Sequence, residues 1–339
     1  MSHVSRSLAD AAFGTIPFPV AYSVLSPEAL LSEVISRYDL ANQASCVFWT
    51  GGVNDTYLVQ TQTQKYMLRV YRTGWRTLSD VLYEIAVLNH LADAGVPVST
   101  PVAQKDGSFA LTLHAPEGPR QAVLFTYAPG EPLNRHDATD SYDHGKAVAA
   151  IHNAADGFTG AQVRSPLDLT YLIDQSLHVI QPLSTCSSAD WDYLQALAER
   201  LRSRIQHFSA QGLDWGICHG DCHMLNDHIA TDRTITFFDF DCCAPGWRAY
   251  DLAILRWSEG FYNMDPGDLL WHAFLKGYTE QRPVSERDLA SIPTFVALRE
   301  FWHTGLIAWL QPGSGLKGFD RYLQRTIRLL RAWEAEHLK

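Results

Sequence analysis

Apolar and polar positions follow two different periods along the chain, and the period changes near residue 130. Before that point, short runs rich in β-branched and aromatic residues, such as 45–60 and 65–71, are separated by polar or glycine-containing segments. Such runs are typical of β-strands, and the polar stretch 61–65 between two of them predicts a hairpin. After that point, apolar residues recur every three or four positions over long segments, which predicts helices.

Two helices are also expected within the strand-rich first part. Over residues 26–40, Ser26 can cap the helix and Pro27 suits its first turn, while the apolar residues share one face. Over residues 78–95, apolar residues again repeat at helical spacing, and Gly95 is a typical terminating residue. The first part therefore combines several strands with one helix before them and one between them.

The segment 127–133, "YAPGEPL", interrupts both patterns with two prolines and a glycine. We place a lobe boundary there. Residues 1–126 are expected to form an N-terminal lobe, with an N-terminal extension, helix 26–40 and a small antiparallel sheet. Residues 127–339 are expected to form a larger, mostly helical lobe, which a hairpin interrupts within 215–241. A β-rich lobe followed by a helical one is an α+β arrangement.

Composition narrows the function classes. The 339 residues are 46% apolar and carry a net charge of −10, which disfavours a nucleic-acid binder because such proteins need a basic face. Six cysteines are too few for a disulfide scaffold, so reduced thiols in the cytoplasm are expected. No stretch of about 18 residues is apolar throughout and the N-terminus lacks a continuous apolar segment, so neither a membrane span nor a signal peptide is expected.

The densest group of reactive residues is "CHGDCHMLNDH" at 218–228, with two cysteines, three histidines, two aspartates and an asparagine. A zinc site would use Cys218, Cys222, His219 and His223, but these pairs interleave in one short segment, which rarely wraps a tetrahedral ion. The two cysteines are expected to behave as small buried apolar residues. His223 is a candidate for substrate or phosphate contact.

The oxygen-bearing residues of the same region indicate a different metal. Asn226 follows Asp221 by five residues, and the strand-like run 234–238 ends at Asp239 and Asp241. Mg²⁺ prefers carboxylate and amide oxygens together with substrate phosphates. Asp221 would then be able to orient a hydroxyl group and take its proton, as in phosphoryl transfer.

The segments "HGDCHMLN", "FFDFD" and "AYDLA" together resemble the aminoglycoside phosphotransferase superfamily, which has a bilobal protein-kinase-like fold and includes choline kinases, some homoserine kinases and a bacterial stress-response Ser/Thr kinase. The resemblance implies that Asp221 is catalytic. It implies Asn226 and Asp239 as metal ligands, with Asp241 assisting. It further implies structural support of the loop. The supporting residues are His219 and Asp251.

Further segments extend the resemblance over residues 45–260. "FWTGGVNDTYLV" is similar to a hairpin that covers the nucleotide, "KYMLRVYR" to the strand that carries a phosphate-binding lysine, and "AVLFTYAPGEPL" to the hinge that meets adenine. The chain departs from the pattern at Arg69, where lysine is usual, although arginine can also bridge a phosphate and a carboxylate. The implied nucleotide-binding residues are Gly51, Gly52, Asn54, Arg69, Glu84, Phe125 and Tyr127.

The acceptor site is predicted from aromatic and acidic residues of the helical lobe. Trp257, Glu259 and Trp302 could hold a cationic amine through ring and carboxylate contacts. The alternative is that most aromatic residues of this lobe belong to its core.

The resemblance thus implies an ATP- and Mg²⁺-dependent phosphotransferase that acts on a hydroxyl of a small molecule, with an aminoglycoside-, choline- or homoserine-like acceptor. The chain is expected to be a cytoplasmic monomer or homodimer without nucleic-acid or membrane partners. One alternative is a Ser/Thr protein kinase of the stress-response type. Another is a nucleotide-binding module without catalytic activity.

Overall fold

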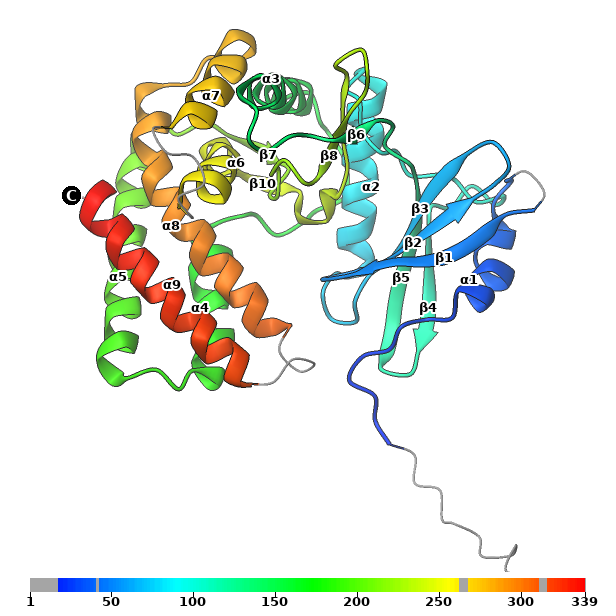
Figure 1. The fold of residues 1–339 in the computed structure, drawn as a ribbon, viewed down its shortest axis with the longest axis horizontal. Coiled ribbons are helices and arrows are strands. Elements are labelled where there is room, and N and C mark those ends of the chain that lie inside the picture. Colours follow the sequence, from blue (N-terminus) through cyan, green and yellow to red (C-terminus); the bar gives the residue numbers. More distant parts are fainter. Residues whose placement is uncertain (1–17, 41–42, 262–267, 311–315, 339) are drawn as a thin grey trace, which may run out of the picture.

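The structure, a computed structural model, describes residues 18–40, 43–261, 268–310 and 316–338, with side chains except at 259–261 and 316–317. Its first part is built around an antiparallel sheet with the strand order β1-β2-β3-β5-β4 (Figure 1). The strands are β1 (Ser45–Gly51), β2 (Asp55–Gln60), β3 (Lys65–Val70), β4 (Ala110–Ala115) and β5 (Gly118–Thr126). Gln60 pairs with Lys65, which confirms the predicted hairpin between β2 and β3.

The two faces of this sheet bury different cores. Helix α1 (Pro27–Glu33) and the 3-10 turn η2 (Ile35–Arg37) cover one face, and helix α2 (Leu78–Asp93) packs on the other. Side chains alternate along a strand, so Leu68 of β3 enters the α1 core while Arg69 faces α2. This alternation places a cation of the sheet opposite a carboxylate of α2.

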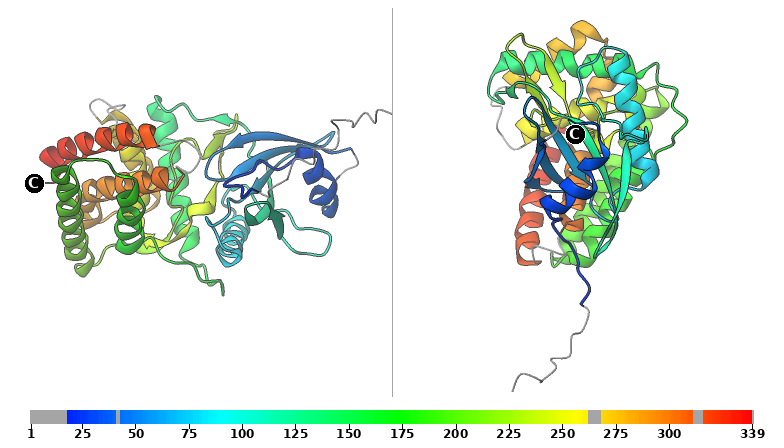
Figure 2. Two further views of the ribbon diagram at one scale, coloured as in Figure 1. Left: turned by 90° about the horizontal axis from the view of Figure 1, so that it is seen from below. Right: turned by 90° about the vertical axis from the view of Figure 1, so that its right-hand side faces the viewer.

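The second part is mostly helical, and α8 runs through its middle with α4, α5, α6 and α9 around it (Figures 1 and 2). Helices α3 and α7 can pack closely because Gly145 has no side chain. A Cβ at this position would lie only 2.1 Å from the carbonyl oxygen of Phe274. The helices are α3 (Ala138–Ala155), α4 (Gln175–Ile180), α5 (Ser188–Ala210), α6 (Arg248–Leu255), α7 (Leu269–Gln281), α8 (Glu286–Trp309) and α9 (Leu316–His337), with the short turns η3 (Thr170–Asp174), η4 (Gln181–Leu183), η5 (Phe240–Cys242) and η6 (Arg256–Phe261).

Two short sheets lie between the helices and the five-stranded sheet. Strand β7 (Trp215–Cys218) pairs with β10 (Ala244–Trp247), and β8 (Asp227–Ile229) pairs with both β9 (Ile235–Phe237) and β6 (Glu131–Pro132). The loop 219–226 leaves β7, and the segment 238–243 joins β9 to β10. The two pairings therefore bring both acidic segments of the sequence to one place.

Two of the predicted helices are shorter than expected. The helix predicted over 26–40 ends at Glu33 and tightens to η2, because Tyr38 must be extended to pair with Gln104. The apolar spacing of residues 249–262 also predicts a helix, but α6 ends at Leu255 and widens into the π-helical turn η6, a feature often found near functional sites. Residue 262 lies outside the described residues. Within the described part of the chain, no helix combines the length and the apolar character required to cross a membrane.

Candidate active site

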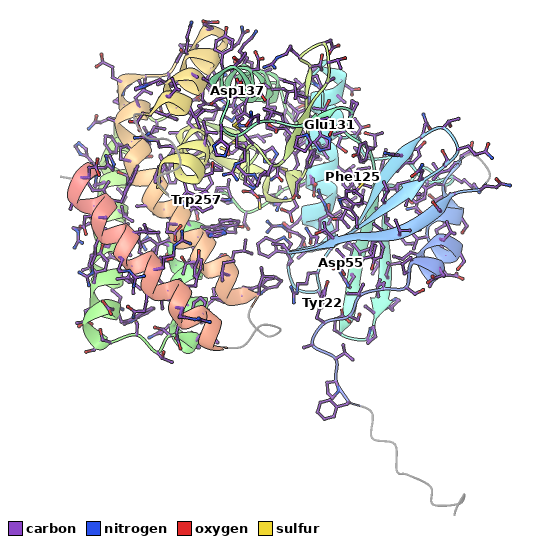
Figure 3. All side chains as sticks on the ribbon, in the orientation of Figure 1. Tyr22, Asp55, Phe125, Glu131, Asp137 and Trp257 are labelled. Atoms are coloured by element: carbon purple, nitrogen blue, oxygen red, sulfur yellow. The ribbon has the colours of Figure 1, made fainter. Side chains whose placement is uncertain are left out.

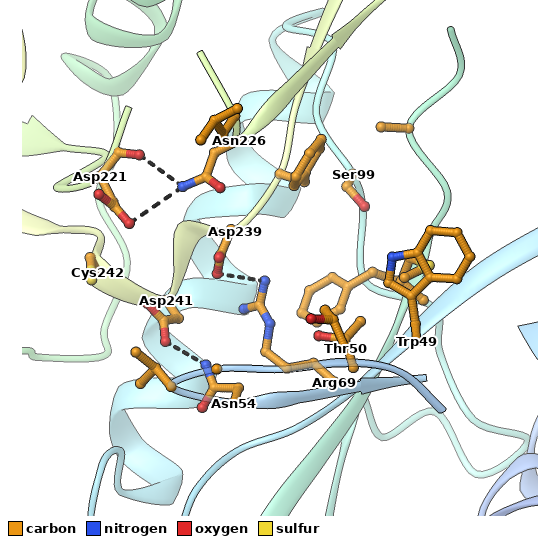
Figure 4. A pocket seen from close by; sticks show the side chains of 18 of the residues that line it. Trp49, Thr50, Asn54, Arg69, Ser99, Asp221, Asn226, Asp239, Asp241 and Cys242 are labelled. Atoms are coloured by element: carbon orange, nitrogen blue, oxygen red, sulfur yellow. Dashed lines mark hydrogen bonds and ion pairs between the residues drawn. The ribbon is translucent and has the colours of Figure 1, made fainter. Parts of the chain in front are cut away.

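A cavity of about 700 Å³ lies where the five-stranded sheet meets the helical part (Figure 4). Its walls come from the β1–β2 hairpin, strands β3 and β5, the segment 127–132, the loop after β7, the segment after β9, and α8. Eight of the residues predicted for the site line it: Gly51, Gly52, Asn54, Arg69, Glu84, Phe125, Tyr127 and Trp302. The four predicted oxygen donors line it as well: Asp221, Asn226, Asp239 and Asp241.

The loop after β7 is held in shape by Asp251 of α6. The Asp251 carboxylate accepts hydrogen bonds from the backbone N–H of His219 at 2.6 Å and of Gly220 at 2.8 Å, and it also meets the His152 ring at 3.0 Å. Gly220 has a φ of 79°, and a Cβ there would lie 2.4 Å from the Cys242 carbonyl oxygen, so only glycine fits. Asp251 and Gly220 together fix the position of the backbone that leads into Asp221.

His219 and Cys222 of this loop, and Cys218 at the end of β7, have structural contacts and do not form a metal site. The His219 ring contacts the Phe238 carbonyl oxygen at 3.1 Å and the Asp221 N–H at 3.2 Å, which ties the two acidic segments together. Cys218 and Cys222 are fully buried, and burial raises the pKa of both thiols well above the ordinary value. A thiol that stays protonated is a poor metal ligand, because the thiolate is the form that binds.

Asp221 and Asn226 lie at opposite ends of the same short loop. Asn226 Nδ2 donates to the Asp221 carbonyl oxygen at 2.9 Å and contacts its carboxylate Oδ2 at 3.4 Å (Figure 4). Because the amide nitrogen is committed to Asp221, a cation would meet the amide oxygen. Burial alone would raise the pKa of the Asp221 carboxyl, but the Arg299 guanidinium beside it lowers that pKa below its ordinary value. Asp221 is therefore ionised, as a proton acceptor must be.

Asp239 follows β9 in a left-handed backbone conformation, with φ at 63°. Its Oδ1 lies 3.0 Å from Arg69 Nη2 (Figure 4). Arg69 Nη1 donates to Glu84 Oε1 at 2.6 Å. Burial raises the pKa of Asp239 to about 7 against the opposing effect of Arg69, and repulsion from Asp241 and Asp221 adds to the rise. A carboxylate crowded by other carboxylates is a position that a divalent cation would stabilise, so the donor set fits Mg²⁺.

Asp241, predicted to assist with metal, joins the two parts of the molecule. Its Oδ2 accepts from Asn54 Nδ2 at 2.6 Å and from Trp75 Nε1 at 2.8 Å, and its carbonyl oxygen accepts from Arg76 Nε at 2.8 Å. Burial opposes ionisation, but Arg76 and Arg69 lower the pKa of Asp241 to about 2. The carboxylate is therefore ionised near neutral pH, and it holds the β1–β2 hairpin through its hydrogen bond from Asn54.

The β1–β2 hairpin and the end of β5 form the other half of the cavity. Gly52 N–H donates to the Asn54 carbonyl oxygen at 3.1 Å, and nothing lies within 4 Å of the position a Cβ at Gly52 would occupy. A ligand can therefore approach this backbone closely. Behind it, Met67 and Phe125 supply an apolar wall next to the segment that begins at Tyr127, a setting suited to a flat ring.

Arg299 of α8 is a site residue that the sequence analysis missed. Its guanidinium forms an ion pair with Asp221 Oδ1, although the two residues are 78 positions apart. Arg299 lies in one of the long segments whose apolar spacing predicts only a helix, and such a pattern cannot report which residue a helix presents to a distant loop. The contact appears only once α8 packs on α6.

The predicted acceptor residues lie at different depths. Trp302 lines the cavity, and His223 Nε2 lies 3.5 Å from Asp221 Oδ1. Trp257 is buried and donates from Nε1 to Glu300 Oε2 at 2.8 Å. The side chain of Glu259 lies outside the described residues. Their roles toward an acceptor stay predictions.

Comparison with known proteins agrees with this geometry. The profile of a family described as "Phosphotransferase enzyme family" matches residues 46–287. An uncharacterised protein of Deinococcus radiodurans is 40% identical over 338 residues, which cover 98% of this chain and 97% of that protein. A homoserine kinase of Xanthobacter autotrophicus is 28% identical over 305 residues, with 87% and 89% covered. A solved microcompartment-associated aminopropanol kinase shares the fold with a TM-score of 0.77 at 23% identity, covering 91% of this chain and 98% of that one.

Proposed function

Because the chain belongs to the phosphotransferase enzyme family, we propose that it transfers the γ-phosphoryl group of ATP to the hydroxyl of a small amino alcohol, with Asp221 as the proton acceptor. The observation that carries this proposal is the meeting of Asp221, Asn226 and Asp239 in one cavity, together with Arg69, which lies 3.0 Å from Asp239, and the open backbone of Gly52. That set provides a base, oxygen donors for a cation and two groups for phosphates.

In the proposed reaction, Asp221 accepts the proton of the acceptor hydroxyl while that oxygen forms a bond to the γ-phosphorus. The bond between the γ-phosphorus and the oxygen of ADP breaks, and the negative charge leaves with ADP. Asn226 and Asp239 would hold Mg²⁺, which supplies charge neutralisation for the phosphates. Arg69 keeps its bond to Glu84 and turns its second nitrogen from Asp239 to a phosphate. Most of the rate enhancement would come from positioning and electrostatics.

The lobe boundary near residues 127–133 is part of the same proposal. Residues 1–126 would hold the nucleotide, with its base against the wall formed by Met67 and Phe125 and its phosphates under the hairpin. Residues 127–339 would supply the proton acceptor, the metal ligands and the acceptor site.

The acceptor class is inferred from the described residues beside Asp221. Trp302 lines this end of the cavity, and so does Trp75, whose indole is fixed by its bond to Asp241. Each ring already contacts an arginine of the chain, Arg299 at 4.3 Å for Trp302 and Arg76 at 4.1 Å for Trp75. The attraction for an amine is therefore assigned to the ionised carboxylates of Asp221 and Asp241 in the cavity. The relatives named above include kinases of homoserine and aminopropanol, which both carry an amine and a hydroxyl.

The test is an acceptor screen with MgATP that includes homoserine, aminopropanol, choline, a neutral diol and a generic protein substrate. We expect ADP release to be stimulated by amino alcohols and not by the neutral diol. Phosphate transfer to the protein substrate, without stimulation by any amino alcohol, would overturn the small-molecule assignment and favour a protein kinase.

A further inference from the structure

Arg299 lies directly behind the catalytic loop and is only 2% exposed. Its Nη2 donates to Asp221 Oδ1, and its Nη1 donates to the Gly220 carbonyl oxygen at 3.2 Å and to the Tyr250 hydroxyl oxygen at 3.3 Å. The donors of a guanidinium form a rigid planar fork. One side chain of α8 thus fixes the carboxylate of Asp221 and the peptide group that precedes it.

Two tryptophans hold the guanidinium in place. Its central carbon lies 4.9 Å from the ring centre of Trp257 and 4.3 Å from that of Trp302, within the range of cation–π attraction. Trp257, which Figure 3 labels in the helical part, is fixed in turn by its bond to Glu300, the residue after Arg299. The cation that these rings contact in the structure therefore belongs to the chain itself.

The two carboxylate oxygens of Asp221 have different surroundings as a result. Oδ1 accepts a hydrogen bond from the charged guanidinium of Arg299 and lies 3.5 Å from His223 Nε2. Oδ2, in contrast, is approached at 3.4 Å by the uncharged amide of Asn226. The strong, charged bond is on Oδ1. Oδ2 is thus the oxygen better able to accept a hydrogen bond from a hydroxyl that enters the cavity.

We propose that Arg299 is a positioning residue for phosphoryl transfer: it anchors Asp221 through Oδ1 so that Oδ2 faces the acceptor hydroxyl. The proposal rests on the proposed function, because it gives Arg299 an effect only through Asp221. It gives α8 and the two tryptophans a role in placing Asp221, although Arg299 is not among the residues that line the cavity.

The test compares Arg299→Met, which removes the charge, with Arg299→Lys, which keeps the charge but loses the fork. Turnover of MgATP is measured with water and with aminopropanol as acceptors. For Arg299→Met we expect kcat to fall about 100-fold, as when a general base is misplaced, while the KM for ATP stays within about threefold. The kcat of Arg299→Lys is expected to be about tenfold higher than that of Arg299→Met because lysine restores a cation beside Oδ1.

Arg248→Met is the matched control. Arg248 of α6 is also 2% exposed and is paired with acidic side chains, Asp214 and Asp156, away from the cavity. Its loss is expected to lower the melting temperature and to leave kcat within about threefold of the wild type, since it does not touch Asp221. The contrast separates a positioning effect from the general cost of removing a buried arginine.

Three results would overturn the proposal: an Arg299→Met enzyme with wild-type kcat, an Arg299→Lys enzyme no faster than Arg299→Met, or a loss that appears only as weaker binding of a non-hydrolysable ATP analogue. Failure of the proposed function itself would look different. In that case Asp221→Asn would turn over ATP as fast as the wild type, whatever the Arg299 variants do.

Discussion

Asn54, in the hairpin between β1 and β2, donates a 2.6 Å hydrogen bond to the carboxylate of Asp241, 187 residues further along the chain. The bond joins the segment that would cover the phosphates to the segment that would hold the metal. The position of the hairpin is therefore set by two interactions: the pairing of β1 with β2 and the hydrogen bond to the Asp241 carboxylate.

Asn54→Ala should weaken nucleotide binding. A hydrogen bond to a charged group contributes about 1.5–3 kcal/mol, so we expect the KM for ATP to rise roughly tenfold, with a smaller change in kcat. Steady-state kinetics with varied ATP measures this. Asn153→Ala, which removes an exposed amide of α3 bonded to the Gln281 carbonyl, is the control. Equal KM values for the wild type and Asn54→Ala would refute the role of this contact.

The pair Arg69–Glu84 should show strong coupling in stability. Both side chains are buried, at 11% and 1% exposure, and breaking such a pair leaves an uncompensated charge at a cost of about 3–5 kcal/mol. We expect Arg69→Met to lower the free energy of unfolding by that order and the double variant Arg69→Met/Glu84→Gln to be less destabilised than the sum of the two. Urea unfolding of all four proteins measures the coupling. Additive losses would contradict it.

Asp251→Ala should disturb the catalytic loop from behind. The substitution removes the acceptor of two backbone N–H groups and of His152, and each buried group left unsatisfied costs about 1–3 kcal/mol. We expect a loss of stability of about 3 kcal/mol together with a lower kcat. Asp251→Asn keeps one acceptor oxygen and should lose less of both. An Asp251→Ala enzyme with unchanged stability would show that the loop is held by other contacts.

His303 should make the folded state sensitive to acid. Burial, reinforced by Arg299, lowers the pKa of His303 to about 3, whereas an unfolded chain has a histidine pKa near 6.5. Below pH 6.5 the unfolded chain therefore binds a proton that the folded chain does not, and the free energy of unfolding falls by about 1.4 kcal/mol per pH unit. Because half of the unfolded chains already carry this proton at pH 6.5, His303→Gln should reduce the loss between pH 6.5 and 5.5 by about 1 kcal/mol. Identical pH dependences for the wild type and His303→Gln would contradict the argument.

Much of the candidate site could be predicted because its key residues are close in sequence. Asp221 and Asn226 share one loop, and the short strand run after them ends at Asp239, so local patterns were enough to predict a cluster of oxygen donors. The structure brings these three residues to the wall of one cavity, as expected from the resemblance. Their roles in catalysis and metal binding stay predictions.

The contacts that the sequence could not reveal are those between distant elements. Arg299 reaches Asp221 only because α8 packs beside α6, and Trp75 reaches Asp241 only because the loop before α2 meets the segment after β9. No periodicity in the chain encodes such a pairing. The same reason applies to Trp257: its aromatic side chain suggested a substrate contact, and its contact with Arg299 became visible only from the packing of η6 on α8. Its role toward an acceptor stays a prediction.

The central claim is that Asp221 takes the proton from the acceptor, and the most direct measurement is the rate of phosphate transfer from MgATP to an amino alcohol by Asp221→Asn. Asparagine keeps the size and one oxygen but cannot act as a base. We predict that kcat falls by about 100-fold or more, while a non-hydrolysable ATP analogue binds within about threefold of its wild-type affinity. A kcat for Asp221→Asn equal to that of the wild-type enzyme would contradict the account.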